Sequence, residues 1–343
     1  MTKELLEKFR KMSSERNPNL ELNDRVLIID GLNTFIRSFC AIPTMDDNGS
    51  HIGGATGFLT SLGYIIRNMY PTRVYVVFDG KGGSQRRRKL FPEYKTGRKT
   101  PTRMNRSYDM TTEQEEKDLM KRQLMVVGQA LQKLPITTIA IDGVEADDIM
   151  SYIAEVTVAN GGKAILYSTD KDFIQLVDDN VTVWNPIKKR LYDTEAVLED
   201  YGVHPTNFLL YRALTGDASD NIPGIKGLGK KTMLKHFPEF TEPGRLTIDG
   251  IIERSSDSRF KILQKIYESR ETLQLNKTLM SLDTQQMSGT SKKLVRNKIE
   301  NPKTEFDKRG LTEVLTESRV IQGIRNYQSW AASSFNTLTR FNG

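Results

Sequence analysis

Nine carboxylates carry the chemistry that this sequence suggests first. They are Asp30, Asp79, Glu145, Asp147, Asp148, Asp170, Asp172, Asp217 and Asp220. Carboxylates gathered at one place repel one another and raise each other's pKa, so a cluster of this size requires a cation. Hard divalent cations take oxygen ligands, and Mg²⁺ in particular combines carboxylates with water and phosphate. The acids therefore predict a metal-dependent enzyme that cleaves phosphodiester bonds.

Five short stretches rich in β-branched residues are expected to form the buried strands that position these acids. They span 25–30, 73–79, 136–142, 163–170 and 181–186. Helical patterns separate most of them, and the pattern at 112–134 begins with Thr112 and Glu115 in the spacing of a capping box. Such alternation predicts an α/β fold with a mostly parallel central sheet flanked by helices on both faces.

The first seven acids fall where the predicted parallel strands end. Asp30 and Asp79 close the first two strands, a Glu-Ala-Asp-Asp group opens the helix after the third, and Asp170 and Asp172 follow the fourth. A single aspartate at such a place is more often a turn residue or a helix cap than a ligand. Here, acids follow four predicted strands, at the edge of the sheet where α/β proteins bind ligands. A shared site is therefore the stronger interpretation.

The segment 81–106 interrupts the α/β pattern beside this acidic edge and carries ten Lys or Arg against one acid. Long loops in compact domains are usually functional or disordered, and a solvated basic loop is the simpler alternative. Its position favours a guide for a phosphate backbone, with Tyr94 or Phe91 available to stack on a base. The residues expected to contact nucleic acid there are Arg86, Arg87, Arg88, Lys89 and Tyr94.

A glycine-rich stretch at 216–237 is typical of a helix–hairpin–helix. Its glycines would let backbone amides approach phosphate, and the following helix adds a partial positive charge. The residues expected to hold DNA are Gly224, Lys226, Gly227, Gly229, Lys230 and Lys231. A nucleotide phosphate loop has a similar glycine pattern, but it requires a preceding strand, and Asp-Asn-Ile-Pro-Gly-Ile precedes this one. Binding of a DNA backbone is therefore the preferred prediction.

The composition agrees with a polyanionic partner and excludes several classes of protein. The 343 residues carry a net charge of +7, one cysteine and three histidines. A single cysteine excludes an internal disulfide and fits a reducing cytoplasm. One cysteine and three histidines also cannot build a usual structural zinc site. No apolar run reaches the roughly 18–20 residues that span a bilayer. Leu5, Leu6, Phe9 and Met12 predict a short docking helix in an N-terminal extension.

Six ordered sequence blocks together resemble the 5′ nucleases, also called flap endonucleases or 5′→3′ exonucleases. The blocks are LIIDG with Asp30, VFDG with Asp79, PEYKTGR at 92–98, GVEADD at 143–148, STDKD at 168–172 and GDASDNIPGIKGLGKKT at 216–232. The family includes phage enzymes and the N-terminal domain of bacterial DNA polymerase I. The length of this chain, without an attached polymerase, favours a phage enzyme.

The resemblance implies two divalent ions, Mg²⁺ by preference with Mn²⁺ able to substitute. One ion would be held by Asp30, Asp79, Glu145 and Asp147, and the other by Asp147 or Asp148 with Asp170, Asp172, Asp217 and Asp220. Lys95 and Arg98 match the family's basic pair, which contacts the scissile phosphate. Segment 81–112 would be the helical arch that a single-stranded 5′ end passes. The hairpin would hold the downstream duplex, with a K⁺ ion at its turn carbonyls.

The implied activity is structure-specific hydrolysis at or near a 5′ end, as an exonuclease and flap endonuclease. Tolerance of RNA at that end predicts RNase H activity and primer removal during replication. The expected partners are DNA with a 5′ flap or free 5′ end, RNA/DNA primer junctions, and a single-strand binding protein or sliding clamp. A cytoplasmic monomer is expected. Its parts would be an extension 1–22, a nuclease core 23–200, a helix–hairpin–helix region 201–245 and a mainly helical region 246–343.

Three alternatives are weaker. A PIN-type ribonuclease shares an acidic sheet edge but would lack the basic segment and the hairpin. A phosphatase with an aspartyl nucleophile would need an Asp-x-Asp pair after the first strand, where only Asp30 is present. A DNA-junction binding protein without catalysis would keep the hairpin, but the complete acid set argues against it. The aromatic tail 326–343 either docks on a replication protein or packs on the domain, and packing is preferred.

Overall fold

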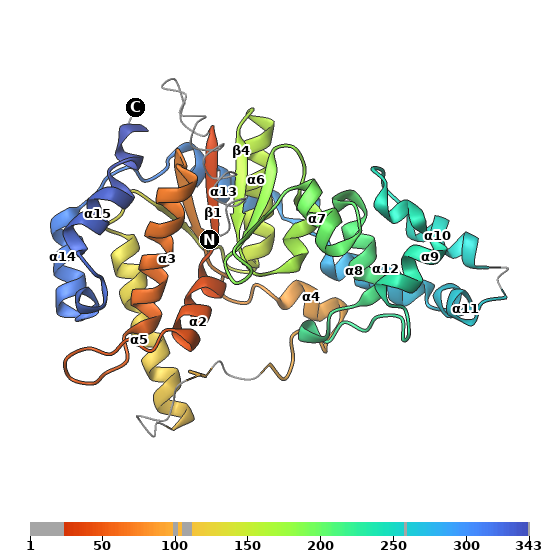
Figure 1. Cartoon of the computed structure of the whole chain (residues 1–343), viewed down its shortest axis with the longest axis horizontal. Coiled ribbons are helices and arrows are strands. Elements are labelled where there is room, and N and C mark those ends of the chain that lie inside the picture. Colours follow the sequence, from red (N-terminus) through yellow and green to blue (C-terminus); the bar gives the residue numbers. More distant parts are fainter. Residues whose placement is uncertain (1–23, 99–101, 105–111, 257–258, 342–343) are drawn as a thin grey trace.

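One central sheet organises the chain in the computed structural model, which describes residues 24–98, 102–104, 112–256 and 259–341 (Figure 1). The strands are β1 (Arg25–Asp30), β2 (Arg73–Val77), β3 (Thr137–Ile139), β4 (Lys163–Tyr167), β5 (Val181–Asn185) and β6 (Arg190–Tyr192). They lie in the order β3-β2-β1-β4-β5-β6. All neighbouring pairs are parallel except β5 with β6, which confirms the predicted mostly parallel sheet.

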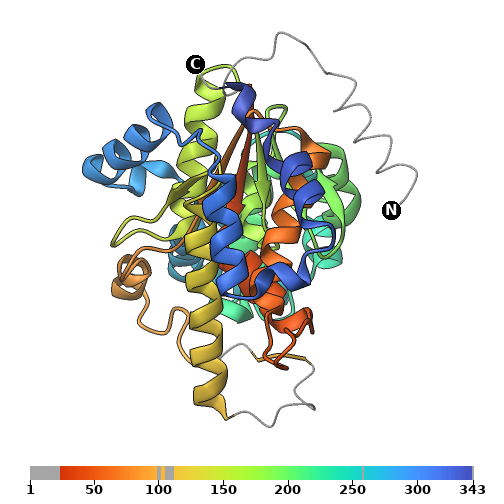
Figure 2. The same ribbon diagram turned by 90° about the vertical axis from the view of Figure 1, so that its left-hand side faces the viewer.

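Helices cover both faces of the sheet because successive strand side chains point to opposite sides. In β1, Leu27 and Ile29 enter one apolar cluster and Val26 and Ile28 enter the other. The first cluster is closed by α2 (Gly31–Ala41), α3 (Gly53–Met69), α5 (Glu113–Leu131), α14 (Lys308–Glu317) and α15 (Tyr327–Phe335). The second includes residues of α6 (Ala146–Ala159), α7 (Thr194–Tyr201) and α13 (Gly289–Glu300). Figure 2 shows α5 (gold) and α14 (blue) lying against each other.

A second group of helices forms the right-hand end of the molecule in Figure 1. It contains α8 (Phe208–Thr215), α9 (Lys230–His236), α10 (Ile248–Ser255), α11 (Lys261–Glu268) and α12 (Arg270–Met280). Asn276 joins α12 to α8 by donating hydrogen bonds to the carbonyls of Ala213 (2.9 Å) and Pro223 (2.7 Å). The helix α4 (Gln85–Leu90), which begins the basic segment, contacts α12, and α13 returns the chain to α6.

Local sequence signals set where the helices nearest the acidic edge begin. Asp30 caps α2, since its Oδ1 accepts a hydrogen bond from Asn33 N (3.0 Å). Thr112 forms the predicted capping box at the start of α5. Glu145 is the N-cap of α6, so the two aspartates that follow lie in its first turn, where the helix dipole favours negative charge.

Several elements differ from the prediction, and β2 and β4 end at Val77 and Tyr167 instead of at 79 and 170. β3 has three residues instead of the predicted 136–142, because the chain turns where Val144 N donates to the Ile141 carbonyl and Gly143 adopts φ 76°. The helix α2 and the antiparallel edge strand β6 were not predicted. The extension 1–22 and its predicted docking helix lie outside the described residues. Over the described ranges, no helix is long and apolar enough to cross a membrane.

The aromatic tail packs on the sheet domain, as predicted. Trp330 is 8% exposed, and its ring meets that of the fully buried Phe335 edge to face at 5.3 Å. α15 lies against α3, where Gly63 leaves room for the indole. A methyl group at position 63 would stand 2.5 Å from Trp330 Nε1 and 2.7 Å from Ser334 Oγ. The tail therefore depends on a glycine in the helix beneath it.

Gly63→Ala should loosen this packing, whereas Gly128→Ala in α5 meets open space. Alanine gains about 0.5–1 kcal/mol over glycine inside a helix, and both variants receive that gain. Overpacking costs about 1–3 kcal/mol. The free energy of unfolding of Gly63→Ala should therefore be lower than that of Gly128→Ala by about this amount. Urea denaturation of the two variants measures the difference, and equal stability would contradict the described packing.

Candidate functional site

The carboxyl ends of β1 and β2 meet the start of α6 at one edge of the sheet. Asp30, the last residue of β1, is 7% exposed and accepts hydrogen bonds from Asn33 N (3.0 Å) and Ser168 Oγ (3.2 Å). Asp79, two residues beyond β2, accepts a hydrogen bond from Ala146 N (2.8 Å). Since Ser168 follows β4, these bonds connect the ends of three parallel strands and a helix N-terminus.

Four acids at this edge have raised pKa values. Burial, aided by the charge of Asp170, raises the pKa of Asp30 to about 7, although the hydrogen bond from Asn33 N opposes the shift. The same two causes raise the pKa of Asp172 to about 7 and that of Asp147 well above its ordinary value. Burial also raises the pKa of Asp170. A cation bound among these groups would favour their ionised forms and lower the pKa values again.

Two cations from the basic segment enter the acidic edge. Lys95 Nζ lies 2.6 Å from Glu145 Oε1, and the carboxylates of Asp147 and Glu145 raise the pKa of Lys95 although burial opposes them. Arg87 in α4 pairs with Glu145 and, at 2.9 Å, with Asp148. Burial alone would raise the pKa of Glu145, but these two cations hold it below its ordinary value.

A third cation, Arg212 of α8, was not predicted. It is 8% exposed, its Nε lies 2.8 Å from Asp172 Oδ1, and its Nη2 pairs with Asp217. The sequence held a signal, because one arginine lies within the apolar stretch of α8 and a buried arginine requires acidic partners. Arg98 forms a similar but more exposed pair with Asp220. The two acids nearest the hairpin are thus also paired with cations of the chain.

The structure therefore brings all nine predicted acids to one region. Within the described ranges, no three His, Cys, Asp or Glu side chains are arranged so that they could hold a metal ion without moving. The donors nevertheless fit hard divalent cations, because all are carboxylate oxygens and several are buried beside one another with raised pKa values.

Two residues predicted to contact nucleic acid are buried, which corrects that prediction. Arg87 is 3% exposed, and besides its acidic partners its Nε donates to the carbonyl of Leu279 (2.8 Å). Tyr94 is 3% exposed and packs with Ile222 and Leu279, so its ring is not available to stack on a base. The accessible basic side chains of α4 are Arg86, Arg88 and Lys89.

The predicted helix–hairpin–helix corresponds to α8, the connection 216–229 and the short helix α9. Gly224 is required there, because a Cβ would lie 2.1 Å from the carbonyl oxygen of Thr215. Gly227 adopts φ 91°, which favours glycine, and Gly229 is the N-cap of α9. The glycines thus serve close backbone approach and turning, as the hairpin interpretation requires.

The lysines of the hairpin differ in their surroundings. Lys226 and Lys231 are exposed. Lys230 is half-buried, and its Nζ donates to the carbonyl of Asp200 (3.2 Å), which ties α9 to α7. Two of the three predicted lysines are therefore accessible to a phosphate, and the third has a structural partner.

Comparison with known proteins identifies two adjoining family domains. Residues 25–202 match the 5′-3′ exonuclease N-terminal resolvase-like domain, and residues 203–304 match the 5′-3′ exonuclease C-terminal SAM fold. A 5′-3′ exonuclease of Aquifex aeolicus is 34% identical over 215 residues, 62% of this chain and 68% of that protein. The thermostable DNA polymerase I of Thermus thermophilus is 31% identical over 266 residues, 77% of this chain but 30% of the polymerase.

Solved structures show the same fold. The T5 D15 protein co-crystallised with metal ions superposes with a TM-score of 0.63 at 23% identity, covering 84% of this chain and 99% of the T5 protein. The bacteriophage T5 D15 flap endonuclease in a complex with DNA and metal ions gives the same TM-score and identity, and covers 85% of this chain.

Arg87 should contribute much more to stability than its neighbour Arg86. Arg87→Gln would leave Glu145 and Asp148 buried without their main cation, which typically costs about 3–5 kcal/mol in the free energy of unfolding. Arg86 is partly exposed and lies 3.4 Å from Asp148, so Arg86→Gln should cost about 1 kcal/mol or less. Chemical denaturation compares the variants, and equal losses would contradict the buried pairing.

Proposed function

The chain belongs to the 5′-3′ exonuclease family, and from this premise we propose that it is a structure-specific 5′ nuclease. It would hydrolyse phosphodiester bonds at or near the 5′ end of DNA, as an exonuclease and a flap endonuclease. The observation that carries the proposal is the gathering of nine carboxylates in one region, at the sheet edge and on the neighbouring loop 217–222, with Lys95 on an adjoining turn. Acids alone would support only metal binding. The ammonium of Lys95 beside them could also stabilise negative charge on a scissile phosphate.

Divalent cations, Mg²⁺ by preference and two in number, are the proposed cofactors, with Mn²⁺ as a substitute. Asp30, Asp79, Asp147, Asp170 and Asp172 are the residues we propose as their main holders, since four of these have pKa values that a cation would lower. When bound, such ions activate a water for in-line attack and offset charge on the leaving oxygen. Glu145, Asp148, Asp217 and Asp220 complete the proposed acid set.

The chain's own cations would bind and orient the phosphate. Lys95 Nζ already lies at the acidic edge, and in the complex it would donate to a non-bridging oxygen of the scissile phosphate, where negative charge grows. Arg98, half-exposed beside the same turn, would bind the neighbouring phosphate. Arg212 would act indirectly, by holding the carboxylates of Asp172 and Asp217 in place.

Recognition of DNA would be structural rather than sequence-specific. Exposed Arg88 and Lys89 on α4 would guide the single-stranded 5′ end, and the hairpin would hold the downstream duplex with Lys226 and Lys231. A K⁺ ion at the turn carbonyls of the hairpin is part of the proposal. Because these contacts involve phosphates alone, the junction between single and double strand would select the cleavage site.

Removal of primers during replication is the proposed role. RNA at the 5′ end of a duplex would then be a substrate, which amounts to an RNase H activity. The DNA polymerase I relatives support a place in replication, and a single-strand binding protein or a sliding clamp is the proposed protein partner. The enzyme would act as a monomer in the cytoplasm.

Asp147→Asn should abolish cleavage of a labelled 5′-flap DNA that the wild type cuts near the junction in Mg²⁺. The acid lies in the first turn of α6 among the charges of Asp170 and Lys95, so its loss removes a central ligand. EDTA should stop the wild type in the same way, and Mn²⁺ should restore it.

The matched control is Asp179→Asn, an exposed acid just before β5 at the opposite edge of the sheet, which should cut like the wild type. A wild type that binds the flap and never cuts, in Mg²⁺ or Mn²⁺, would replace this proposal with the junction-binding protein.

Lys95→Ala and Lys89→Ala should separate chemistry from binding. Loss of a cation that acts on the transition state typically lowers the cleavage rate by about 10²–10³-fold, so Lys95→Ala should lower the single-turnover rate with little change in flap affinity. Lys89 is exposed on α4, so Lys89→Ala should weaken binding and reduce its salt dependence with the rate preserved at saturation. Filter binding and single-turnover cleavage measure both, and a reversed pattern would refute these roles.

A further inference from the structure

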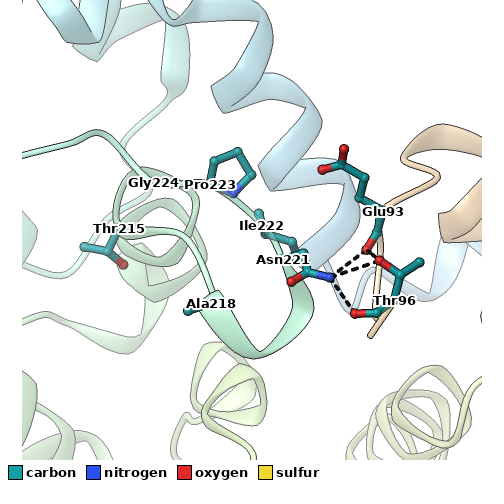
Figure 3. Close-up of a pocket in the computed structure, with 8 residues that line it drawn as sticks. All are labelled: Glu93, Thr96, Thr215, Ala218, Asn221, Ile222, Pro223 and Gly224. Atoms are coloured by element: carbon teal, nitrogen blue, oxygen red, sulfur yellow. Dashed lines mark hydrogen bonds between the residues drawn. The ribbon is translucent and has the colours of Figure 1, made fainter. Parts of the chain in front are cut away.

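The turn that carries Lys95 is fastened to a loop from the second domain (Figure 3). Asn221 Nδ2 donates hydrogen bonds to the carbonyls of Glu93 (2.9 Å) and Thr96 (2.8 Å), and it lies 3.3 Å from Thr96 Oγ1. In the other direction, Lys95 N donates to the carbonyl of Asp220 (3.2 Å). One side-chain amide and one backbone bond thus lock the turn 93–96 onto the loop 217–222.

Both sides of this contact hold a backbone conformation that needs support. Lys95 has φ 56° and Asn221 has φ 62°, in the left-handed region that costs most residues about 1–2 kcal/mol. Asparagine tolerates this region well, whereas lysine remains there only if its surroundings enforce it. The bonds from Asn221 lie on both sides of Lys95 in the chain, so they enforce its conformation directly.

The loop that supplies Asn221 is itself rigid and acidic. Asp217 and Ile222 exchange two backbone hydrogen bonds of 2.8 Å, which close the loop. Asp217 is held by Arg212, and Asp220 by Arg98. The contact therefore fixes the turn of Lys95 against the same segment that bears two of the nine acids.

We propose that Asn221 is a positioning residue for cleavage, which acts by holding the turn 93–96 so that the Lys95 ammonium is presented to the acidic edge. The proposal rests on the proposed nuclease function and adds a residue that contacts neither metal nor phosphate. Its amide is the part that matters, since both of its N–H groups donate hydrogen bonds to carbonyls of the turn. Without them, Lys95 would be free to leave the left-handed conformation, and its ammonium would move away from Glu145.

Asn221→Gly is the first test, because glycine accepts φ 62° and the side-chain amide is removed without backbone strain. We expect the single-turnover rate on 5′-flap DNA to fall by about 10–100-fold, with the flap dissociation constant unchanged within about twofold. In a Lys95→Ala background the same change should lower the rate by less than about twofold, because the two residues act in series. Asn221→Asp keeps the shape of the side chain but loses its N–H donors. Its single-turnover rate should fall at least as far as that of Asn221→Gly.

Asn326→Gly is the control, since Asn326 is an exposed asparagine with φ 50° at the start of the remote helix α15. It should cut at the wild-type rate. An unchanged rate in Asn221→Gly, or a loss that multiplies in full with that of Lys95→Ala, would overturn the positioning role.

Hydrogen exchange separates failure of this proposal from failure of the proposed function. The backbone amide of Lys95 is bonded to Asp220, so its exchange should speed up in Asn221→Gly and stay as in the wild type in Asn326→Gly. This readout needs no cleavage. A wild type without nuclease activity would refute the proposed function, whereas unchanged exchange at Lys95 in Asn221→Gly would refute the contact itself.

Discussion

The burial of mutually repelling carboxylates at one sheet edge is the constraint on which the rest of this structure depends. Parallel strands end together, so β1, β2 and β4 and the start of α6 deliver their acids to the same place. Burial and neighbouring charge raise the pKa values of four acids: Asp30, Asp147, Asp170 and Asp172. Such a site favours whatever brings positive charge, whether a proton, a metal ion or a basic side chain.

Basic side chains from outside the sheet pair with these acids and offset the repulsion. The same side chains connect distant parts of the chain. Arg87 reaches from α4 to Glu145 and also to the carbonyl of Leu279 at the end of α12. Arg212 lies beyond residue 202, where the second family domain begins, yet it pairs with Asp172 of the first. The acidic centre is therefore built by both domains, and separating them would leave acids of the sheet edge unpaired.

The sequence made the sheet and its acids predictable because both depend on local patterns. Each signal spans only a few neighbouring residues: the β-branched stretches, the Thr112 capping box and the acids at strand ends. The partners of the cations are not local: Arg87 looked like one more basic residue of an exposed segment, and Tyr94 like a stacking ring. Their burial arises from packing against α12, nearly 200 residues away. Arg212 carried a signal, an arginine in an apolar helix, but its partner Asp172 lies 40 residues away, and only the fold brings the two together.

The most direct test of the central constraint is the unfolding midpoint of wild type and Asp147→Asn, each in EDTA and in Mg²⁺. If buried repulsion governs this edge, removing one charge should make the metal-free Asp147→Asn more stable than the wild type. Mg²⁺ should then stabilise the wild type more than the variant, because binding to the folded state alone raises stability by mass action. A metal-free variant less stable than the wild type, with equal stabilisation of both by Mg²⁺, would contradict the account.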